Sequence, residues 1–120
     1  MITDTIVAPA TAEGKAGLSV IRLSGNKSHD ICLKLTNNKV KFVDRKPVLS
    51  PVFLGESIID RALITFFRAP RSYTGDDVFE ISCHGSPIIV KSILNTLCKF
   101  GARTANPGEF TMRSFLSGKI

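Results

Sequence analysis

A change in the spacing of apolar residues around position 85 constrains the fold more than any other feature of this sequence. Over Val78–His84, apolar and polar side chains alternate, which is typical of a strand with one buried face. After Gly85 the apolar spacing becomes that of a helix. Ser86 and Pro87 suit its first two positions, and Gly101 suits its end. A strand that runs directly into a helix predicts a sheet with helices packed on one side.

The rest of the chain alternates between segments typical of strands and segments typical of helices. Strands are expected at residues 5–8, 18–23, 78–84 and 102–105, with two more between residues 48 and 67 around a turn at 55–57, and helices at 26–36, 87–100 and 110–117. Pro47 and Pro51 place the first strand of the pair at an edge of the sheet. Asn106 and Glu109 predict the N-cap and N3 residues of a capping box at the last helix. The predicted fold class is α+β, a mixed sheet covered by about three helices.

Length and composition indicate one globular domain over residues 1–120, with an apolar fraction of 43%. A chain of this size buries roughly 65% of its unfolded surface, so it needs no metal or disulfide for stability. The longest apolar run is too short to span a bilayer, and the amino terminus lacks the apolar segment of a signal peptide. We therefore expect a cytoplasmic location. Cys32, Cys83 and Cys98 have long, irregular spacings and are expected to be buried thiols.

Charge and the absence of common motifs narrow the function. Lysine and arginine number 16 against 10 acidic residues, so the net charge of +6 permits phosphate or carboxylate ligands, although the basic residues are scattered. Neither a G-x-x-x-x-G-K-[ST] nor a G-x-G-x-x-G string occurs, which excludes a P-loop and leaves a dinucleotide cradle unsupported. His29 and His84 have no serine and aspartate at an identifiable nucleophile elbow, so a hydrolase triad is unsupported.

Four strings in order carry a family resemblance. They read R-L-S-G at residues 22–25, S-Y-T-G-D-D at 72–77, E-I-S-C-H-G at 80–85 and P-G-E-F-T-M-R-S-F-L-S-G-K at 107–119. Together they resemble the amino-terminal domain of the tRNA modification GTPase family MnmE, also called TrmE. The departures are a different loop at residues 11–17 and the residues Asp76, Ser114 and Ser117, where the family usually has Glu, Ala and Asn. The helical and GTPase domains of the family are absent from this chain.

The resemblance implies a fold related to the folate-binding part of aminomethyltransferases. It also implies a domain that binds a reduced folate such as 5-formyltetrahydrofolate and forms a homodimer. The full protein would act with the flavin-containing partner MnmG (GidA) on carbon 5 of the wobble uridine of tRNA. GTP, magnesium and potassium would bind only to the absent GTPase domain, so this segment alone is expected to hydrolyse no GTP.

The resemblance places the folate contacts on Arg22, Glu80 and Lys119. A carboxylate accepts two hydrogen bonds from the 2-amino and N3 side of a pterin, whereas arginine and lysine pair with the carboxylates of a glutamyl tail. Each residue also has a purely structural interpretation. Arg22 can extend from a strand edge into water, and Glu80 can simply occupy a solvent-facing strand face. Lys119 can interact with the negative end of a helix dipole. No catalytic residue or metal ligand is assigned.

Four further residues have two interpretations each. Tyr73 and Thr74 either contribute to the site or only form a turn. His84 either faces a ligand or satisfies a backbone carbonyl, and Glu109 is expected to be a helix cap rather than a catalyst.

Two other classes of function stay open. A stand-alone basic RNA-binding module is suggested by the charge of +6 and by nine aromatic residues, of which eight are phenylalanine. Against it, no RNP1-like string occurs and most of the phenylalanines occupy positions expected in the core. A small independent folate enzyme of the aminomethyltransferase type would need a further domain and a catalytic acid that the sequence does not identify.

Overall fold

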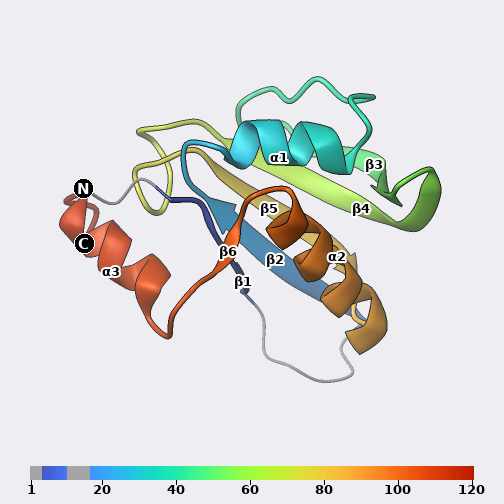
Figure 1. Cartoon of the computed structure of the whole chain (residues 1–120). Coiled ribbons are helices and arrows are strands. Elements are labelled where there is room, and N and C mark those ends of the chain that lie inside the picture. Colours follow the sequence, from blue (N-terminus) through green and yellow to red (C-terminus); the bar gives the residue numbers. More distant parts are fainter. Residues whose placement is uncertain (1–3, 11–16) are drawn as a thin grey trace.

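Six strands form one mixed sheet in a computed structural model that describes residues 4–10 and 17–120 (Figure 1). The strands are β1 (Ile6–Pro9), β2 (Leu18–Ser24), β3 (Val48–Leu54), β4 (Ser57–Phe67), β5 (Val78–His84) and β6 (Arg103–Thr104), and the helices are α1 (Ser28–Leu35), α2 (Pro87–Lys99) and α3 (Glu109–Leu116). The strand order is β3-β4-β5-β2-β1-β6. Only the β1–β6 pair is parallel among these strands, so the predicted α+β class with a mixed sheet is confirmed.

The hydrophobic core lies between the sheet and the two helices α1 and α2, which cover the same face (Figure 1). From β5 this face receives Phe79, Ile81 and Cys83, as the alternation predicts. The Phe79 ring stacks on Phe66 with centroids 4.6 Å apart, and the ring of His29 packs on both. Aromatic burial of this kind contributes roughly 2–3 kcal/mol per side chain, so these residues serve the fold.

The opposite face of the sheet is not covered by α1 or α2 and carries both polar and apolar rows. Glu80 of β5 lies between Arg22 of β2 and Thr65 of β4. In the next row, Val20, Ser82, Leu63 and Leu49 follow one another across four strands. Leu63 is 44% exposed and Leu49 67%. We call this surface the open face, and α3 lies apart from α1 and α2 at the β1–β6 end (Figure 1).

Several predicted boundaries shift by one or two residues, and one prediction is wrong. Asn106 is not the N-cap of α3, because the helix begins at Glu109 and Gly108 precedes it in the left-handed region with φ of 74°. One of the two hydrogen bonds of a capping box is present, since the Glu109 carboxylate accepts the Asn106 N–H at 2.8 Å. The edge position of β3, which contains Pro51, is confirmed. Of the predicted loop after β1, residues 11–16 lie outside the described part of the chain.

Within residues 4–10 and 17–120, no helix has both the length and the apolar character needed to cross a membrane. Cys32 and Cys83 are buried as expected, whereas Cys98 is half-buried. Burial raises the pKa of the Cys83 thiol to about 11, which keeps it protonated and unreactive near neutral pH.

Gly25 allows the end of β2 to pass against the segment before β1. Its φ is +142°, and a Cβ there would lie 2.5 Å from Thr5 Oγ1 and 2.6 Å from Thr5 Cα. Thr5 in turn accepts the Lys27 N–H through its hydroxyl at 3.1 Å. The chain reversal between β2 and α1 therefore requires glycine at position 25.

We predict that Gly25→Ala lowers the free energy of unfolding by roughly 2–4 kcal/mol, because the methyl group meets backbone atoms and the φ angle disfavours an L side chain. Urea denaturation followed by circular dichroism measures the loss. Gly55→Ala is the control, since Gly55 has a φ of +63° but no atom within 4 Å of a Cβ, and should lose about 1 kcal/mol. Equal losses in the two variants would show that the close approach to Thr5 is unimportant.

Candidate functional site

Arg22 and Glu80 form an ion pair on the open face. They lie opposite each other in the β2–β5 register, and Arg22 donates to Glu80 Oε2 from Nη2 at 2.9 Å and from Nε at 3.2 Å. Their side chains are 28% and 33% exposed, so both remain accessible to a ligand. Among the described residues, Glu80 Oε1 has no hydrogen-bond donor. The pair therefore presents a fixed carboxylate with one oxygen available.

Tyr73 links this pair to α3. The Arg22 guanidinium carbon lies 5.2 Å from the centroid of the Tyr73 ring, which is a cation–π contact. The Tyr73 hydroxyl lies 3.1 Å from Thr111 Oγ1, and the Tyr73 carbonyl accepts the Ser114 hydroxyl at 2.6 Å. Of the two interpretations for Tyr73, contribution to the site fits better than a turn role alone. Thr74 is instead buried and hydrogen-bonded to Ser24 at 2.7 Å, which is a structural role.

Lys119 follows α3 and lines a pocket of about 520 Å³. Tyr73 lines the same pocket, so one aromatic ring contacts Arg22 and also borders the space that Lys119 borders. Lys119 makes no direct contact with Arg22 or Glu80 within the described ranges. The structure thus brings the three predicted residues to one region of the surface, with Tyr73 between them.

Gly75 permits the loop that carries Tyr73 to approach the end of α3. Its φ is +86°, and a Cβ there would lie 2.9 Å from Ser117 Cβ and 3.8 Å from Lys119 Cε. The Lys119 N–H donates to the Ser114 carbonyl at 2.9 Å, which closes the last turn of the helix. The position of Lys119 therefore depends on the packing of this loop against α3.

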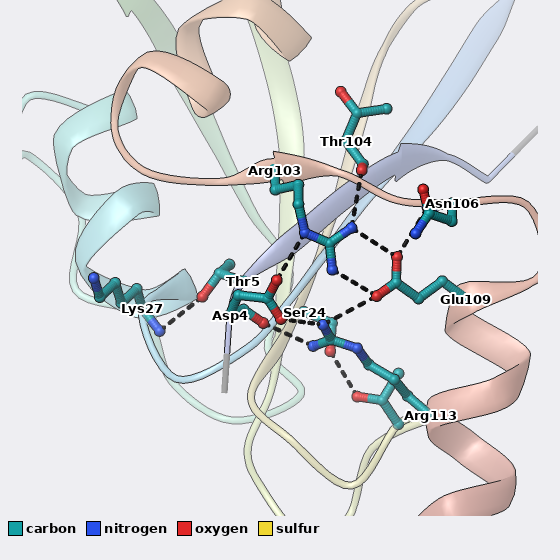
Figure 2. A network of polar contacts seen from close by, with 10 residues as sticks. Asp4, Thr5, Ser24, Lys27, Arg103, Thr104, Asn106, Glu109 and Arg113 are labelled. Carbon is teal, nitrogen blue, oxygen red and sulfur yellow. Dashed lines mark hydrogen bonds and ion pairs between the residues drawn. The ribbon is translucent and has the colours of Figure 1, made fainter. Parts of the chain in front are cut away.

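A network of charged residues attaches α3 to the edge of the sheet (Figure 2). Arg103 of β6 donates to both oxygens of Glu109, at 2.9 and 2.6 Å, and to Asp4 Oδ2 at 2.7 Å. Arg113 of α3 donates to Asp4 Oδ1 at 2.7 Å, to the Asp4 carbonyl at 2.8 Å and to Glu109 Oε2 at 3.3 Å. Glu109 and Arg113 are buried. Hydrogen bonds between charged groups are stronger than those between neutral groups, and here the buried Glu109 and Arg113 meet the more exposed Asp4 and Arg103.

The network changes the ionisation of its carboxylates. Hydrogen bonds from Arg103 hold the pKa of Glu109 at about 2, and the same arginine lowers the pKa of Asp4. Glu109 therefore acts in a wider network than the helix cap that the sequence predicts. Asp4, Arg103 and Arg113 were not predicted, because only the tertiary fold brings residues 4, 103 and 113 together.

His84 pairs with Asp60 rather than with a backbone carbonyl. Its ring Nδ1 lies 2.7 Å from Asp60 Oδ1, and its backbone N–H donates to Asp60 Oδ2 at 2.9 Å. Burial opposes ionisation of Asp60, but the hydrogen bonds from His84 outweigh it and lower the pKa of the carboxyl. No group of histidine, cysteine and acidic residues that could hold a metal occurs in the part of the chain that the structure describes.

Half of the eight phenylalanines cannot stack on the bases of a nucleic acid. Four phenylalanines are buried in the structure, namely Phe42, Phe53, Phe66 and Phe79. Single-stranded RNA is bound by exposed rings on which bases stack, and buried rings cannot serve in this way. The structure therefore disfavours the RNA-binding alternative.

Fold and site together define an α+β domain with an ion pair on an open sheet face beside a pocket bordered by cationic and aromatic side chains. Residues 5–119 match a family model described as the GTP-binding protein TrmE N-terminus. The chain belongs to this family, which confirms the resemblance carried by the four sequence strings.

Similar proteins named tRNA modification GTPase MnmE occur in several bacteria. The chain is 44% identical to that of Thermotoga maritima over 117 residues, which cover 98% of the chain and 26% of the relative. It is 48% identical to that of Pseudothermotoga lettingae over 118 residues, with the same coverage. It is 42% identical to that of Helicobacter pylori over 119 residues, which cover 99% of the chain and 26% of the relative. The chain thus spans about a quarter of the length of these relatives.

We predict that Glu109→Gln lowers the free energy of unfolding by about 3 kcal/mol at pH 7, because two arginines lose their shared carboxylate. The pKa of Glu109 is lowered from 4.5 to about 2 by folding, so its stabilisation is complete above pH 5 and is lost as the pH falls from 4.5 to 2. Urea denaturation between pH 2 and pH 7 should show that the free energy of unfolding decreases less on acidification in the variant than in the wild type.

Glu56→Gln is the matched control for this prediction, since Glu56 is exposed in the β3–β4 turn. Its pH profile should follow that of the wild type. If the free energy of unfolding of Glu109→Gln decreased on acidification as much as that of the wild type, the pH-dependent stabilisation would have to come from other carboxylates.

Proposed function

We propose that this chain is the folate-binding and dimerising domain of a protein that modifies tRNA. The observation that carries the proposal is the fixed Arg22–Glu80 pair on the open face, with Lys119 and a charged pocket on the far side of Tyr73. A reduced folate has the complementary layout, because it carries a hydrogen-bonding pterin at one end and carboxylates at the other.

In this proposal Glu80 binds the pterin. Its free Oε1 accepts hydrogen bonds from the 2-amino and N3 groups, whereas Oε2 already accepts two hydrogen bonds from Arg22. Arg22 fixes the carboxylate in place, and it is therefore a positioning residue for Glu80 rather than a partner of the glutamyl tail. Lys119 supplies the positive charge for the first tail carboxylate. The donors and acceptors of the chain thus suit 5-formyltetrahydrofolate.

The open face also suits a homodimer. Leu18, Leu49 and Leu63 expose 63%, 67% and 44% of their surface there. Single exposed apolar residues are common, but several on one face of a sheet are typical of an interaction surface, and here Leu49 and Leu63 are direct neighbours across β3 and β4. A second copy of this chain is the partner that the resemblance implies, and the pairing would bury these leucines.

In this proposal the remaining activities belong to a part of the protein that corresponds to the three quarters of the relatives' length outside the matched region. GTP hydrolysis with magnesium and potassium, contact with the flavin-containing partner MnmG, and modification of the wobble uridine at carbon 5 would take place there or in the whole complex, in the cytoplasm. This chain, which has no P-loop, would hold the folate and join two subunits.

We predict that Glu80→Gln weakens the binding of 5-formyltetrahydrofolate roughly tenfold to a hundredfold, because charge-assisted hydrogen bonds to the pterin are lost. Titration calorimetry of the 120-residue chain measures the affinity. Glu56→Gln, at an exposed turn, is the control and should bind like the wild type. Unchanged affinity in Glu80→Gln would remove Glu80 from the site, and no binding by the wild type would overturn the folate proposal.

We predict that Leu63→Glu converts the homodimer to a monomer, because it places a charge in the centre of the apolar row. Analytical ultracentrifugation of the chain gives the mass in solution. Ile88→Glu is the control, since Ile88 is 82% exposed at the start of α2, away from the open face. Dimers that persist in Leu63→Glu, or a wild type that is monomeric at high concentration, would contradict the assignment of this surface.

A further inference from the structure

The pocket beside Lys119 has two more cationic residues that the predicted site does not use. Arg45, from the segment between α1 and β3, and Arg71, from the loop between β4 and β5, line it together with Lys119. Phe67 and Tyr73 supply its aromatic walls. Three cationic side chains and no acidic side chain border the pocket, which Ile120 lines as well, so it is suited to a ligand with negative charges.

The two arginines share a single acidic partner. Asp44 Oδ1 lies 3.1 Å from Arg45 Nη1, and Asp44 Oδ2 lies 3.8 Å from Arg71 Nη2. The carboxylate also accepts the Arg68 N–H at 2.8 Å. One negative charge therefore serves two guanidinium groups. Lys119 has no ion-pair partner among the described residues, so Asp44 is the one acidic side chain paired with these three cationic side chains there.

Arg45 is held by several contacts, whereas the Arg71 side chain has only the long ion pair with Asp44 among the described residues. The Arg45 guanidinium lies 5.4 Å from the centroid of the Phe67 ring and donates to the Arg71 carbonyl. Its backbone adopts a φ of 62°, which is uncommon outside glycine. Arg71 has a side chain that is 77% exposed. The pocket therefore presents one guanidinium held against an aromatic ring and one that is largely exposed to solvent.

We propose that Arg45 and Arg71 form a second anion subsite, which selects folates with an oligo-γ-glutamyl tail over folates with one glutamate. The inference rests on the proposed folate function and extends it to the form of the ligand. Each added glutamyl residue brings one more carboxylate, and Lys119 can pair with only the first of them. The later carboxylates pass along the aromatic wall to the two arginines.

The test compares monoglutamyl and triglutamyl 5-formyltetrahydrofolate by titration calorimetry with the 120-residue chain at low salt. The triglutamyl form should bind roughly threefold to tenfold more tightly, since partly exposed ion pairs contribute modestly. Arg71→Ala should remove most of this advantage while leaving the affinity for the monoglutamyl form unchanged. Circular dichroism checks that the variant folds, which its exposed position favours.

Two control variants separate this inference from the proposed function. Lys91→Ala removes an equal charge from an exposed position on α2 and should keep the triglutamyl advantage. Glu80→Gln should weaken both ligands by the same factor. Equal binding of the two ligands by the wild type, or an advantage that survives in Arg71→Ala, would overturn the subsite while the folate proposal stands. Failure of both ligands to bind would overturn the folate proposal and this inference with it.

Discussion

The charge network of Asp4, Arg103, Glu109 and Arg113, in which Glu109 and Arg113 are buried, determines where α3 lies, and much of the candidate site depends on α3. The helix has only eight residues, and its exposed side includes Phe115 and Leu116. Isolated helices of this length are unstable in water, so the helix needs tertiary contacts. The four charged residues supply these contacts, because Glu109 and Arg113 of α3 pair with Arg103 of β6 and with Asp4, which precedes β1 (Figure 2).

Loop packing transmits this constraint to the binding residues. The end of α3 meets the Tyr73 loop at Gly75, and Ser114 holds the Tyr73 carbonyl. Tyr73 then stacks with Arg22, which holds Glu80. A chain of direct contacts thus connects the charge network at one edge of the sheet with the ion pair on its open face. Lys119 and the ion pair keep their relative positions because both lie against the loop that contains Tyr73 and Gly75.

Local patterns predicted much of the fold, whereas long-range pairings were beyond them. The alternation over Val78–His84 correctly separated the core face from the face that carries Glu80, because alternation follows directly from strand geometry. The start of α3 was misplaced because Glu109 was assigned to a local cap, whereas its main partner, Arg103, belongs to a different element. Arg45 and Arg71 were missed for the same reason. They lie 26 residues apart, and neither belongs to a recognisable string.

The two faces of β5 explain how one strand can serve both stability and recognition. Phe79 and Ile81 are fully buried against α1 and α2, where any polar replacement would lack a partner. Glu80 points to the other face, where water and Arg22 stabilise its charge at little cost. A buried carboxylate would need several fixed donors to stay ionised, and those donors would leave it unable to bind a ligand. The half-exposed position of Glu80 therefore suits the proposed role, since Arg22 holds one carboxylate oxygen and the other has no donor among the described residues.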